Sequence, residues 1–451
     1  MRKIIQYMMM ALIAVVLASC ANDISEESTP TVKSNIRFVV DDFPMFEKPS
    51  TRTIGEEDKG KTAWAVGDEI CVKLESKELG TQTATLKYNG VKFEIQDGNS
   101  LCYLDGEPVT AYAYYAPNRR WRNDGNLGYK DGEHDGTAEF LEATCTVHYG
   151  DDNYIDISFA NVTRNYSRLR IATLPNEQIT VDTEYFTPAG SSDMEQNGNY
   201  TLTSDEKGNA YLYGTFKNNS EVTVKYREAA LTTYTFSQAT ESAKSYALDA
   251  TVISANSAEE IKSAIEQKVA DGKTTIRLNL APNAGTDEFM AIREAIKGAA
   301  PNDEGTIELT IIGVETIPEE AFKRMSQLKS VKMPDVKEIK KYAFSECTYL
   351  TVVEAPSLNK LNSGAFNKCN LLSKLTFGPI NYADARYWPI FEDITPNIDL
   401  ILSDYQKEMI KTDDDLYTAN NDIDYALSNK HLNKNFLGHE FKSITCRMKV
   451  E

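Results

Sequence analysis

The chain has 451 residues, 41% of them hydrophobic and 10% aromatic, and its formal net charge at pH 7 is −19. This length predicts two to four domains with packed cores. Because nucleic-acid binding requires Lys and Arg to neutralise phosphates, the acidic balance argues against a nucleic-acid partner. A large net charge favours solubility, as a surface or secreted protein requires.

Residues 1–20 are typical of a signal peptide. The basic pair Arg2-Lys3 precedes an apolar run at residues 8–17 that is too short to span a membrane as a helix. The run leads into the sequence LASC, which ends at Cys20 and resembles a bacterial lipobox. The resemblance implies cleavage before Cys20, lipid attachment to that residue, and anchoring by its acyl chains. An ordinary secretory signal with a chance cysteine is the alternative.

Residues 21–33, with the sequence ANDISEESTPTVK, are polar and acidic and show no apolar period. This composition predicts a flexible tether. The acidic residues just after Cys20 resemble the export signal of Bacteroidetes lipoproteins that reach the outer face of the outer membrane. The predicted location is therefore the outer surface of the cell.

Residues 34–252 show a β-strand pattern throughout. Short apolar or alternating runs are separated by turn signals such as Asn89-Gly90 and Asp105-Gly106. The predicted strands are residues 35–40, 69–74, 83–88, 109–115, 155–159, 169–174, 200–202, 210–216 and 222–226. Many short strands with regular turns predict all-β sandwiches, and the length suits two of them, over residues 34–160 and 161–252.

Three motifs follow one another in the first of these regions. They are TRT at residues 51–53, Trp64 followed by GDEI at 67–70, and AYAYYAP at 111–117. In this order they resemble the fimbrillin family of Bacteroidetes, which comprises subunits of donor-strand pili and their tip and anchor relatives. The resemblance implies fimbrillin-like β-domains.

The fimbrillin resemblance also implies a donor-strand pilus partner. In that mechanism the strand at residues 35–40 is removed by cleavage at an arginine such as Arg37 or Arg52, and a partner's strand enters the groove. From the residues alone, Trp64 is expected to anchor a core.

After residue 252 the pattern changes to helices and strands. A helix is predicted over residues 256–269, with the N-cap at Asn256-Ser257. A strand over 275–280 and a second helix over 288–297 follow. Because this block, residues 253–304, directly precedes a repeat, we expect it to cap the repeat at its N-terminal end.

Three segments align without a gap at a spacing of 22 residues. Their sequences are IPEEAFKRMSQLKSVKMP at 317–334, IKKYAFSECTYLTVVEAP at 339–356 and LNSGAFNKCNLLSKLTFG at 361–378. A period this short predicts a solenoid, in which each unit buries its apolar face only against its neighbours. The pattern resembles the leucine-rich repeats of the BspA-like family over residues 305–380, and implies an α/β leucine-rich repeat solenoid.

Two columns of the repeat carry specific predictions. Phe322, Phe344 and Phe366 are expected to share one interior column. Cys347 and Cys369 share a column with Met325, which suggests an apolar filler and therefore free thiols. A disulfide remains the alternative, because neighbouring rungs lie only about 4.8 Å apart.

The repeat breaks after residue 380, and residues 381–451 are predicted to form a C-terminal cap. One further strand is expected near residues 398–402. A helix is expected over 405–411, and a final strand over 436–441.

No catalytic, cofactor or metal site is predicted. The four histidines, His134, His148, His431 and His439, lack metal-binding spacing, and the chain contains no nucleotide-binding or serine-hydrolase motif. Two acidic stretches, 151–156 and 413–424, are candidates for calcium, although neither has EF-hand spacing and solvated loops are the alternative.

The outward positions of the repeat strands form a small polar face without an aromatic stripe. Its candidate ligand-binding residues are Ser330, Lys332, Val352, Glu354, Lys374 and Thr376, with Glu308 and Thr310 on the preceding strand. This face is a candidate site for a protein or glycan ligand. A face that simply meets solvent is the alternative.

These observations predict a lipid-anchored surface protein for adhesion or binding, and not an enzyme. One alternative is a glycan-capturing accessory lipoprotein of a polysaccharide-uptake system, which requires exposed aromatic side chains such as Trp121 and Trp388. Another is a pilus-associated structural subunit. A hydrolase is a third, but no acid pair in the sequence stands out for it.

Overall fold

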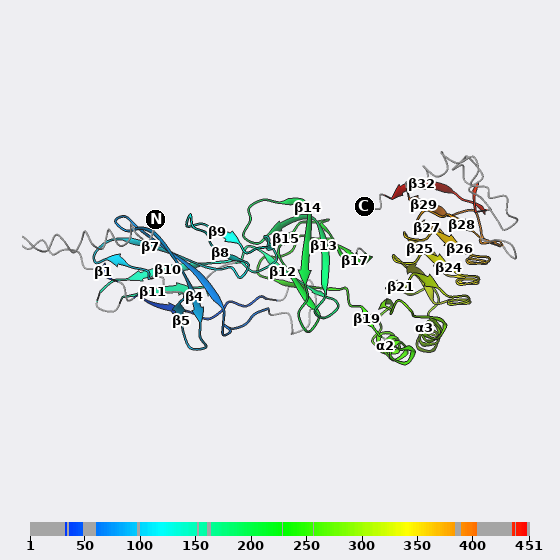
Figure 1. Cartoon of the computed structure of the whole chain (residues 1–451), viewed down its shortest axis with the longest axis horizontal. Helices are drawn as coiled ribbons and strands as arrows, with labels where there is room; N and C mark the ends of the chain where they lie inside the picture. The colour runs from blue at the N-terminus through cyan, green and yellow to red at the C-terminus, as the bar shows by residue number, and fades with distance from the viewer. Residues whose placement is uncertain are drawn as a thin grey trace, which may run out of the picture. The chain divides into compact units, whose positions relative to one another are not determined.

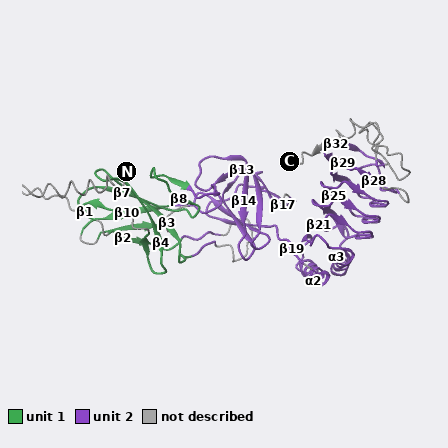
Figure 2. Ribbon diagram, in the orientation of Figure 1, with its two compact units in different colours: residues 1–43, 63–128, 142–162 green, residues 44–62, 129–141, 163–451 purple. Residues whose placement is uncertain are grey.

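The computed structural model describes residues 32–33, 36–47, 60–96, 100–150, 153–159, 164–227, 229–255, 257–383, 389–403, 435–437 and 439–448. The chain divides into two compact units (Figure 2): residues 1–43, 63–128 and 142–162, and residues 44–62, 129–141 and 163–451. Several predictions lie outside the described residues: the signal peptide with Cys20, most of the tether, the motif at 51–53 with Arg52, Asp151-Asp152 of the first calcium candidate, residues 405–411 and 413–424, Trp388 and His431.

A seven-stranded sheet in the order β2-β11-β10-β7-β3-β4-β5 forms the first unit. Its strands are β2 (Arg37–Val40), β3 (Glu69–Ser76), β4 (Gly80–Tyr88), β5 (Phe93–Ile95), β7 (Val109–Tyr115), β10 (Leu141–His148) and β11 (Tyr154–Ser158). Two small sheets pair β1 (Val32–Lys33) with β6 (Tyr103–Leu104), and β8 (Arg119–Trp121) with β9 (Leu127–Tyr129).

Trp64 organises the aromatic core of this unit, as the sequence predicts. Its ring makes edge contacts with four others, those of Phe43 at 4.8 Å, Phe93 at 4.9 Å, Tyr115 at 5.4 Å and Phe159 at 5.5 Å. The indole Nε1 donates a hydrogen bond to the Asp41 carbonyl at 2.7 Å, so its polar group is satisfied.

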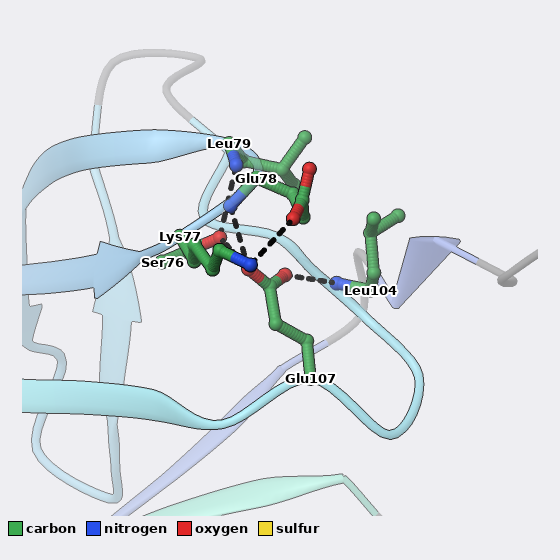
Figure 3. A network of polar contacts seen from close by, with 6 residues as sticks. All are labelled: Ser76, Lys77, Glu78, Leu79, Leu104 and Glu107. Atoms are coloured by element: carbon green, nitrogen blue, oxygen red, sulfur yellow. Dashed lines mark hydrogen bonds and ion pairs between the residues drawn. The ribbon is translucent and has the colours of Figure 1, made fainter.

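One carboxylate holds the turn between β3 and β4 (Figure 3). Glu107 accepts hydrogen bonds from the Ser76 hydroxyl at 2.8 Å and from the Glu78 amide at 2.7 Å. Its second oxygen accepts a hydrogen bond from the Leu104 amide at 3.4 Å. These donors, the Glu78 amide foremost, favour the charged form and hold the pKa of the Glu107 carboxyl below its usual value.

The second unit begins with another seven-stranded sheet, in the order β17-β16-β13-β15-β12-β18 with β14 paired to β13. The strands are β12 (Ser167–Ala172), β13 (Gln178–Pro188), β14 (Glu195–Thr203), β15 (Asn209–Phe216), β16 (Glu221–Tyr226), β17 (Ala229–Thr235) and β18 (Ser245–Asp249). β13 pairs with β16 through residues 180–183 and with β15 through residues 186–188.

The change of partner along β13 occurs at Tyr185, whose φ of 52° is in the left-handed region. A strand that changes partners at such a bend lets one hydrogen-bonded sheet fold over a single core. Side chains from all seven strands accordingly belong to one buried cluster. The sandwich predicted for this region is therefore, in hydrogen bonding, one folded sheet.

A buried ion pair attaches earlier chain segments to the second unit. Arg164 pairs with Glu139, and both side chains are almost fully buried. The guanidinium also donates to the carbonyls of Pro44 at 2.7 Å and Met45 at 3.3 Å, and lies 4.1 Å from the Phe46 ring centroid. Burial raises the pKa of the Glu139 carboxyl, and Arg164 opposes that rise.

Two parallel sheets build the repeat (Figure 1). The large sheet contains β19 (Ile253–Ser254), β20 (Thr275–Asn279), β21 (Ile307–Ile312), β23 (Leu328–Lys332), β25 (Val352–Ala355), β27 (Lys374–Phe377), β29 (Asp399–Ser403) and β32 (Ser443–Met448). The small sheet contains β22 (Thr316–Ile317), β24 (Glu338–Ile339), β26 (Lys360–Leu361) and β28 (Tyr382–Ala383). The two predicted helices are α2 (Ala258–Ala270) and α3 (Thr286–Ala299), and the Ser257 side chain caps α2.

The predicted α/β character is wrong for the repeat units themselves. Within residues 305–380, all described, each unit consists of two strands joined by tight turns, and helices occur only in the preceding cap. Two positions per turn explain this difference. Glu320, Tyr342 and Gly364 have positive φ, as do Arg324, Glu346 and Lys368. Left-handed residues at both ends of so short a segment prevent a helix.

The predicted phenylalanine column is confirmed. The Phe322 and Phe344 rings stack with centroids 5.3 Å apart, and the Phe344 and Phe366 rings with centroids 5.5 Å apart. Phe391 continues the stack at 5.7 Å, and Phe289 of α3 closes its other end with an edge contact. Because Lys374 on β27 pairs with Asp399 on β29, the fourth rung has a spacing of 25 residues rather than 22.

The predicted final strand over residues 436–441 is wrong. Asn435–Phe436 (β30) and His439–Glu440 (β31) pair as a two-stranded hairpin, and the last strand of the large sheet is β32. Phe441, which is fully buried, contacts Phe391 at 5.6 Å and covers the phenylalanine column. The apolar pattern therefore marked the residues that close the core rather than a strand.

We expect Phe344→Ala to lower the free energy of unfolding of the repeat by about 3–5 kcal/mol, because the ring is fully buried between two others. Leu371→Ala is the control, since Leu371 is 52% exposed, and should change it by less than about 0.5 kcal/mol. Urea unfolding followed by circular dichroism measures both. Equal effects of the two substitutions would contradict the column.

We expect Glu107→Gln to destabilise the first unit at neutral pH, because a neutral amide accepts more weakly from the turn donors. The folded pKa of Glu107 lies below its unfolded value. Its contribution is therefore complete above the unfolded pKa, about 4.3, and is lost as the pH falls through the folded pKa. Urea titrations at neutral and acid pH should show the gap between wild type and variant closing in acid, and a gap independent of pH refutes this role.

Candidate functional site

The structure brings the six candidate ligand-binding residues together on the outer face of the large sheet. They lie on β23, β25 and β27 in two columns. In the first column Ser330 faces Val352, which faces Lys374. In the second, Lys332 faces Glu354, which faces Thr376. Parallel pairing in register produces this arrangement, and the role of the face in binding remains a prediction.

The N-terminal end of this face is covered. Thr310, expected to point outward, is only 5% exposed. On the neighbouring strand β20, Arg277 is buried and its Nε donates to the Leu231 carbonyl of β17 at 2.7 Å. Ile312, at the end of β21, packs into the core of the folded β-sheet. Glu308, the other candidate on β21, stays partly exposed and pairs with Lys329 at 2.8 Å, so the covered part of the face ends within β21.

The C-terminal end of the face extends further than the sequence predicts. Ile401 on β29 pairs with Thr376 and continues the second column. The period of 22 residues does not predict that Ile401 lies beside Thr376, because the fourth rung contains three additional residues. Only the alternation of Ile398, Leu400 and Leu402 signals this strand in the sequence.

Charged side chains elsewhere on the stack pair between neighbouring rungs. On the small sheet, Lys360 meets Glu338 at 3.1 Å, and Lys337 meets Glu315 at 2.5 Å. On the turns, Arg324 meets Glu346 at 3.1 Å. These pairs connect neighbouring rungs, although some charges on the turns, such as the exposed Lys368, have no ion-pair partner among the described residues.

The large sheet also pairs charges between rungs. Lys329 meets Glu308 at 2.8 Å, Lys332 lies 3.6 Å from Glu354, and Asp399 is bound by Lys442 at 3.1 Å and by the Ser443 hydroxyl. Lys374 is exposed and has no ion-pair partner among the described residues. The face therefore presents one free cation beside Val352 and Thr376.

Cys347 and Cys369 are free thiols, as the sequence predicts. Each is fully buried and donates to a backbone carbonyl of the preceding rung, Cys347 to Phe322 at 3.0 Å and Cys369 to Phe344 at 3.1 Å. Burial raises the pKa of Cys347 to about 12 and raises that of Cys369 as well. Both thiols therefore remain protonated core side chains.

The remaining candidates lie apart from this face. His148 contacts Asp156 at 3.0 Å in the first unit, and the Trp121 indole donates to the Ala84 carbonyl at 2.9 Å. Burial lowers the pKa of His439, which lies against Phe391 and Phe441. No three His, Cys, Asp or Glu side chains gather as metal ligands in the described part of the chain. None of the described helices is long and apolar enough to cross a membrane.

Comparison with known families supports the repeat. Residues 306–387 match the BspA type leucine-rich repeat region, which confirms the predicted family for this part of the chain. No curated protein matches the chain.

Similarity to solved structures is weak. A putative cell adhesion protein of Bacteroides fragilis is 10% identical, with a TM-score of 0.26 over 48% of this chain and 93% of that one. The fimbrial anchor protein of Porphyromonas gingivalis is 10% identical, with a TM-score of 0.19 over 44% and 80%. The minor pilin of Streptococcus agalactiae is 11% identical, with a TM-score of 0.16 over 48% and 94%. TM-scores this low carry no inference about the fold.

Proposed function

We propose that this protein, whose residues 306–387 match the BspA type leucine-rich repeat, is a cell-surface adhesion or binding protein. The large sheet of the repeat is the surface that meets a protein or glycan ligand. One observation carries the proposal: on the large sheet, the exposed Lys374 lies beside Val352 and Thr376 and has no ion-pair partner among the described residues.

The residues around Lys374 suit a ligand that combines an acceptor with an apolar group. Val352 and Thr376 flank the ammonium on the same face, and Ile401 continues the surface. A free cation beside partly exposed apolar side chains supplies both charge and contact area. An acidic or hydroxyl-rich epitope of a host or bacterial surface molecule meets these requirements.

Lipid anchoring at Cys20 completes the proposal. Acyl chains on Cys20 hold the protein at the outer membrane, and the tether at 21–33 separates the described units from the lipid. The proposed role is binding at the cell surface, which involves no catalysed reaction.

A pilus-associated structural role is the second candidate, and the position of β2 favours it. β2 lies at the edge of the first sheet, and among the described strands it pairs only with β11, in parallel, through residues 37–40. Phe38 is the buried residue of β2, and Val39 is exposed, so the strand places one side chain in the core. A short edge strand of this kind can be replaced by a partner's strand.

Glycan capture through aromatic stacking receives less support. The Trp121 indole is half-buried and hydrogen-bonded to the Ala84 carbonyl, which limits its use as a stacking platform. Among the described residues, no aromatic side chain lies in the accessible columns of the large sheet between β23 and β29.

The repeat face is tested with Lys374→Glu and the matched control Lys368→Glu. Both lysines are exposed on the same repeat unit, but Lys368 lies on the turn. We expect the chain from residue 21 to bind a component of an extracellular-matrix or glycan array. Lys374→Glu should weaken that binding about tenfold, while Lys368→Glu leaves it unchanged. Equal loss in both variants would exclude the face as the site.

Cys20→Ser tests the anchor. The wild-type protein should incorporate labelled palmitate in its native host and remain with the outer membrane, whereas the variant should do neither. Incorporation of label into the variant would contradict attachment at Cys20.

The pilus candidate makes a separate prediction about the N-terminus. If a partner's strand replaces β2, protein recovered from assembled polymers should begin directly after an arginine such as Arg37 or Arg52, as determined by N-terminal sequencing. Polymers in which the strand is intact would rule out this route.

A further inference from the structure

The helical cap carries a groove between α2 and α3. One face of α2 contributes Glu259, Lys262, Ser263 and Glu266, and one face of α3 contributes Asp287, Met290, Ala291 and Glu294, with Ala258 at one end. The opposite faces of both helices pack inward through Ile261, Ile265, Phe289, Ile292 and Ile296. The groove therefore lies on the side of the cap that faces away from the repeat core.

The rim of the groove is acidic. Its four carboxylates face a single cation, Lys262, which lies 3.9 Å from Glu294. Glu259, Glu266 and Asp287 have no ion-pair partner in the described part of the chain. On the repeat, by comparison, several charges pair between neighbouring rungs.

Helix capping accounts for only part of this charge. Glu259 and Asp287 occupy first turns, where the helix dipole favours a carboxylate. Glu266 and Glu294 lie beyond the first turns, so the dipole does not explain them. The ion pair with Lys262 accounts for Glu294, whereas Glu266 has no ion-pair partner among the described residues.

The floor of the groove is apolar. Met290 is 42% exposed at its centre, and the small side chains of Ala258 and Ala291 lie beside it. The outer surface of a terminal cap on stacked repeats is normally polar, since nothing packs against it. A flexible thioether between small residues is a common feature of surfaces that receive an apolar side chain from a partner.

The negative charge of the groove indicates which kind of partner can bind there. A second copy of this groove would place carboxylate against carboxylate, and an anionic membrane or nucleic acid would be repelled. A polypeptide with Lys and Arg beside apolar residues satisfies both the rim and the floor. Helices dock into such grooves by inserting a row of side chains.

We propose that the α2–α3 groove binds a Lys- and Arg-rich amphipathic helix of a partner protein. The groove is lined from Ala258 to Glu266 on α2 and from Asp287 to Glu294 on α3, so it is about 12 Å long at 1.5 Å per residue. About two turns of a partner helix cover this length. Its apolar stripe covers Met290, and its cations meet Glu259 and Glu266 on one rim and Asp287 on the other.

The probe for this site is a fluorescent amphipathic peptide of about 15 residues made of Leu and Lys at helical spacing. Fluorescence anisotropy measures its binding to the chain from residue 21, which contains all the described residues. Two peptides serve as references: one with the same composition in scrambled order, and one with Glu in place of Lys. We expect only the amphipathic Lys peptide to bind well, and its binding to weaken with added salt.

The double variant Glu259→Lys/Glu266→Lys should weaken binding of the probe about tenfold. Glu206→Lys, on an exposed turn of the folded β-sheet, is the charge control and should have no effect. Met290→Gln tests the floor without changing the charge and should weaken binding as well. Circular dichroism confirms that each variant is folded.

Equal binding of the scrambled peptide, or equal weakening by Glu206→Lys, would show only attraction to an acidic protein and would overturn the proposal. Unchanged binding to the folded Met290→Gln variant would overturn it too. Lys374→Glu should leave probe binding intact, so the proposal for this groove and the proposal for the repeat face are tested independently.

Discussion

The stacking of phenylalanine rings at a constant register is the interaction on which the repeat depends. Phe322, Phe344 and Phe366 occupy equivalent places on successive rungs and stack at 5.3 and 5.5 Å. Ring contact fixes the offset between rungs, and the parallel ladders on both sides follow that offset. A shift of one residue would turn each buried column toward solvent, so the core and the surface share one constraint.

The same register also places charged side chains of neighbouring rungs beside each other on the surface. Because equivalent positions lie directly beside each other, a lysine on one rung meets a glutamate on the next, as for Lys360 with Glu338. Repetition therefore places opposite charges beside each other on several rungs. Lys374 on the large sheet has no such partner among the described residues, and the α2–α3 groove lies on the helical cap, outside the repeated rungs.

The connection to the folded β-sheet determines which part of the repeat is available. Arg277 and Ile312 are engaged by that sheet, so β20 and the end of β21 are covered, whereas Glu308 on β21 stays partly exposed. The buried Arg164–Glu139 pair adds earlier segments of the chain to the same unit. These buried polar contacts join segments that are far apart in the chain, and the sequence alone does not show that these segments belong to one unit.

The sequence by itself determined the features that local patterns encode. The 22-residue period identified the phenylalanine column and the free thiols, and helical spacing with the Ser257 cap located α2. Only the tertiary structure decided the partner change of β13 at Tyr185, the fourth rung at a spacing of 25 residues, and the burial of Thr310. The physical reason is range: periodicity and capping act between residues near in sequence, whereas strand partners and covered faces depend on contacts between segments far apart in the chain.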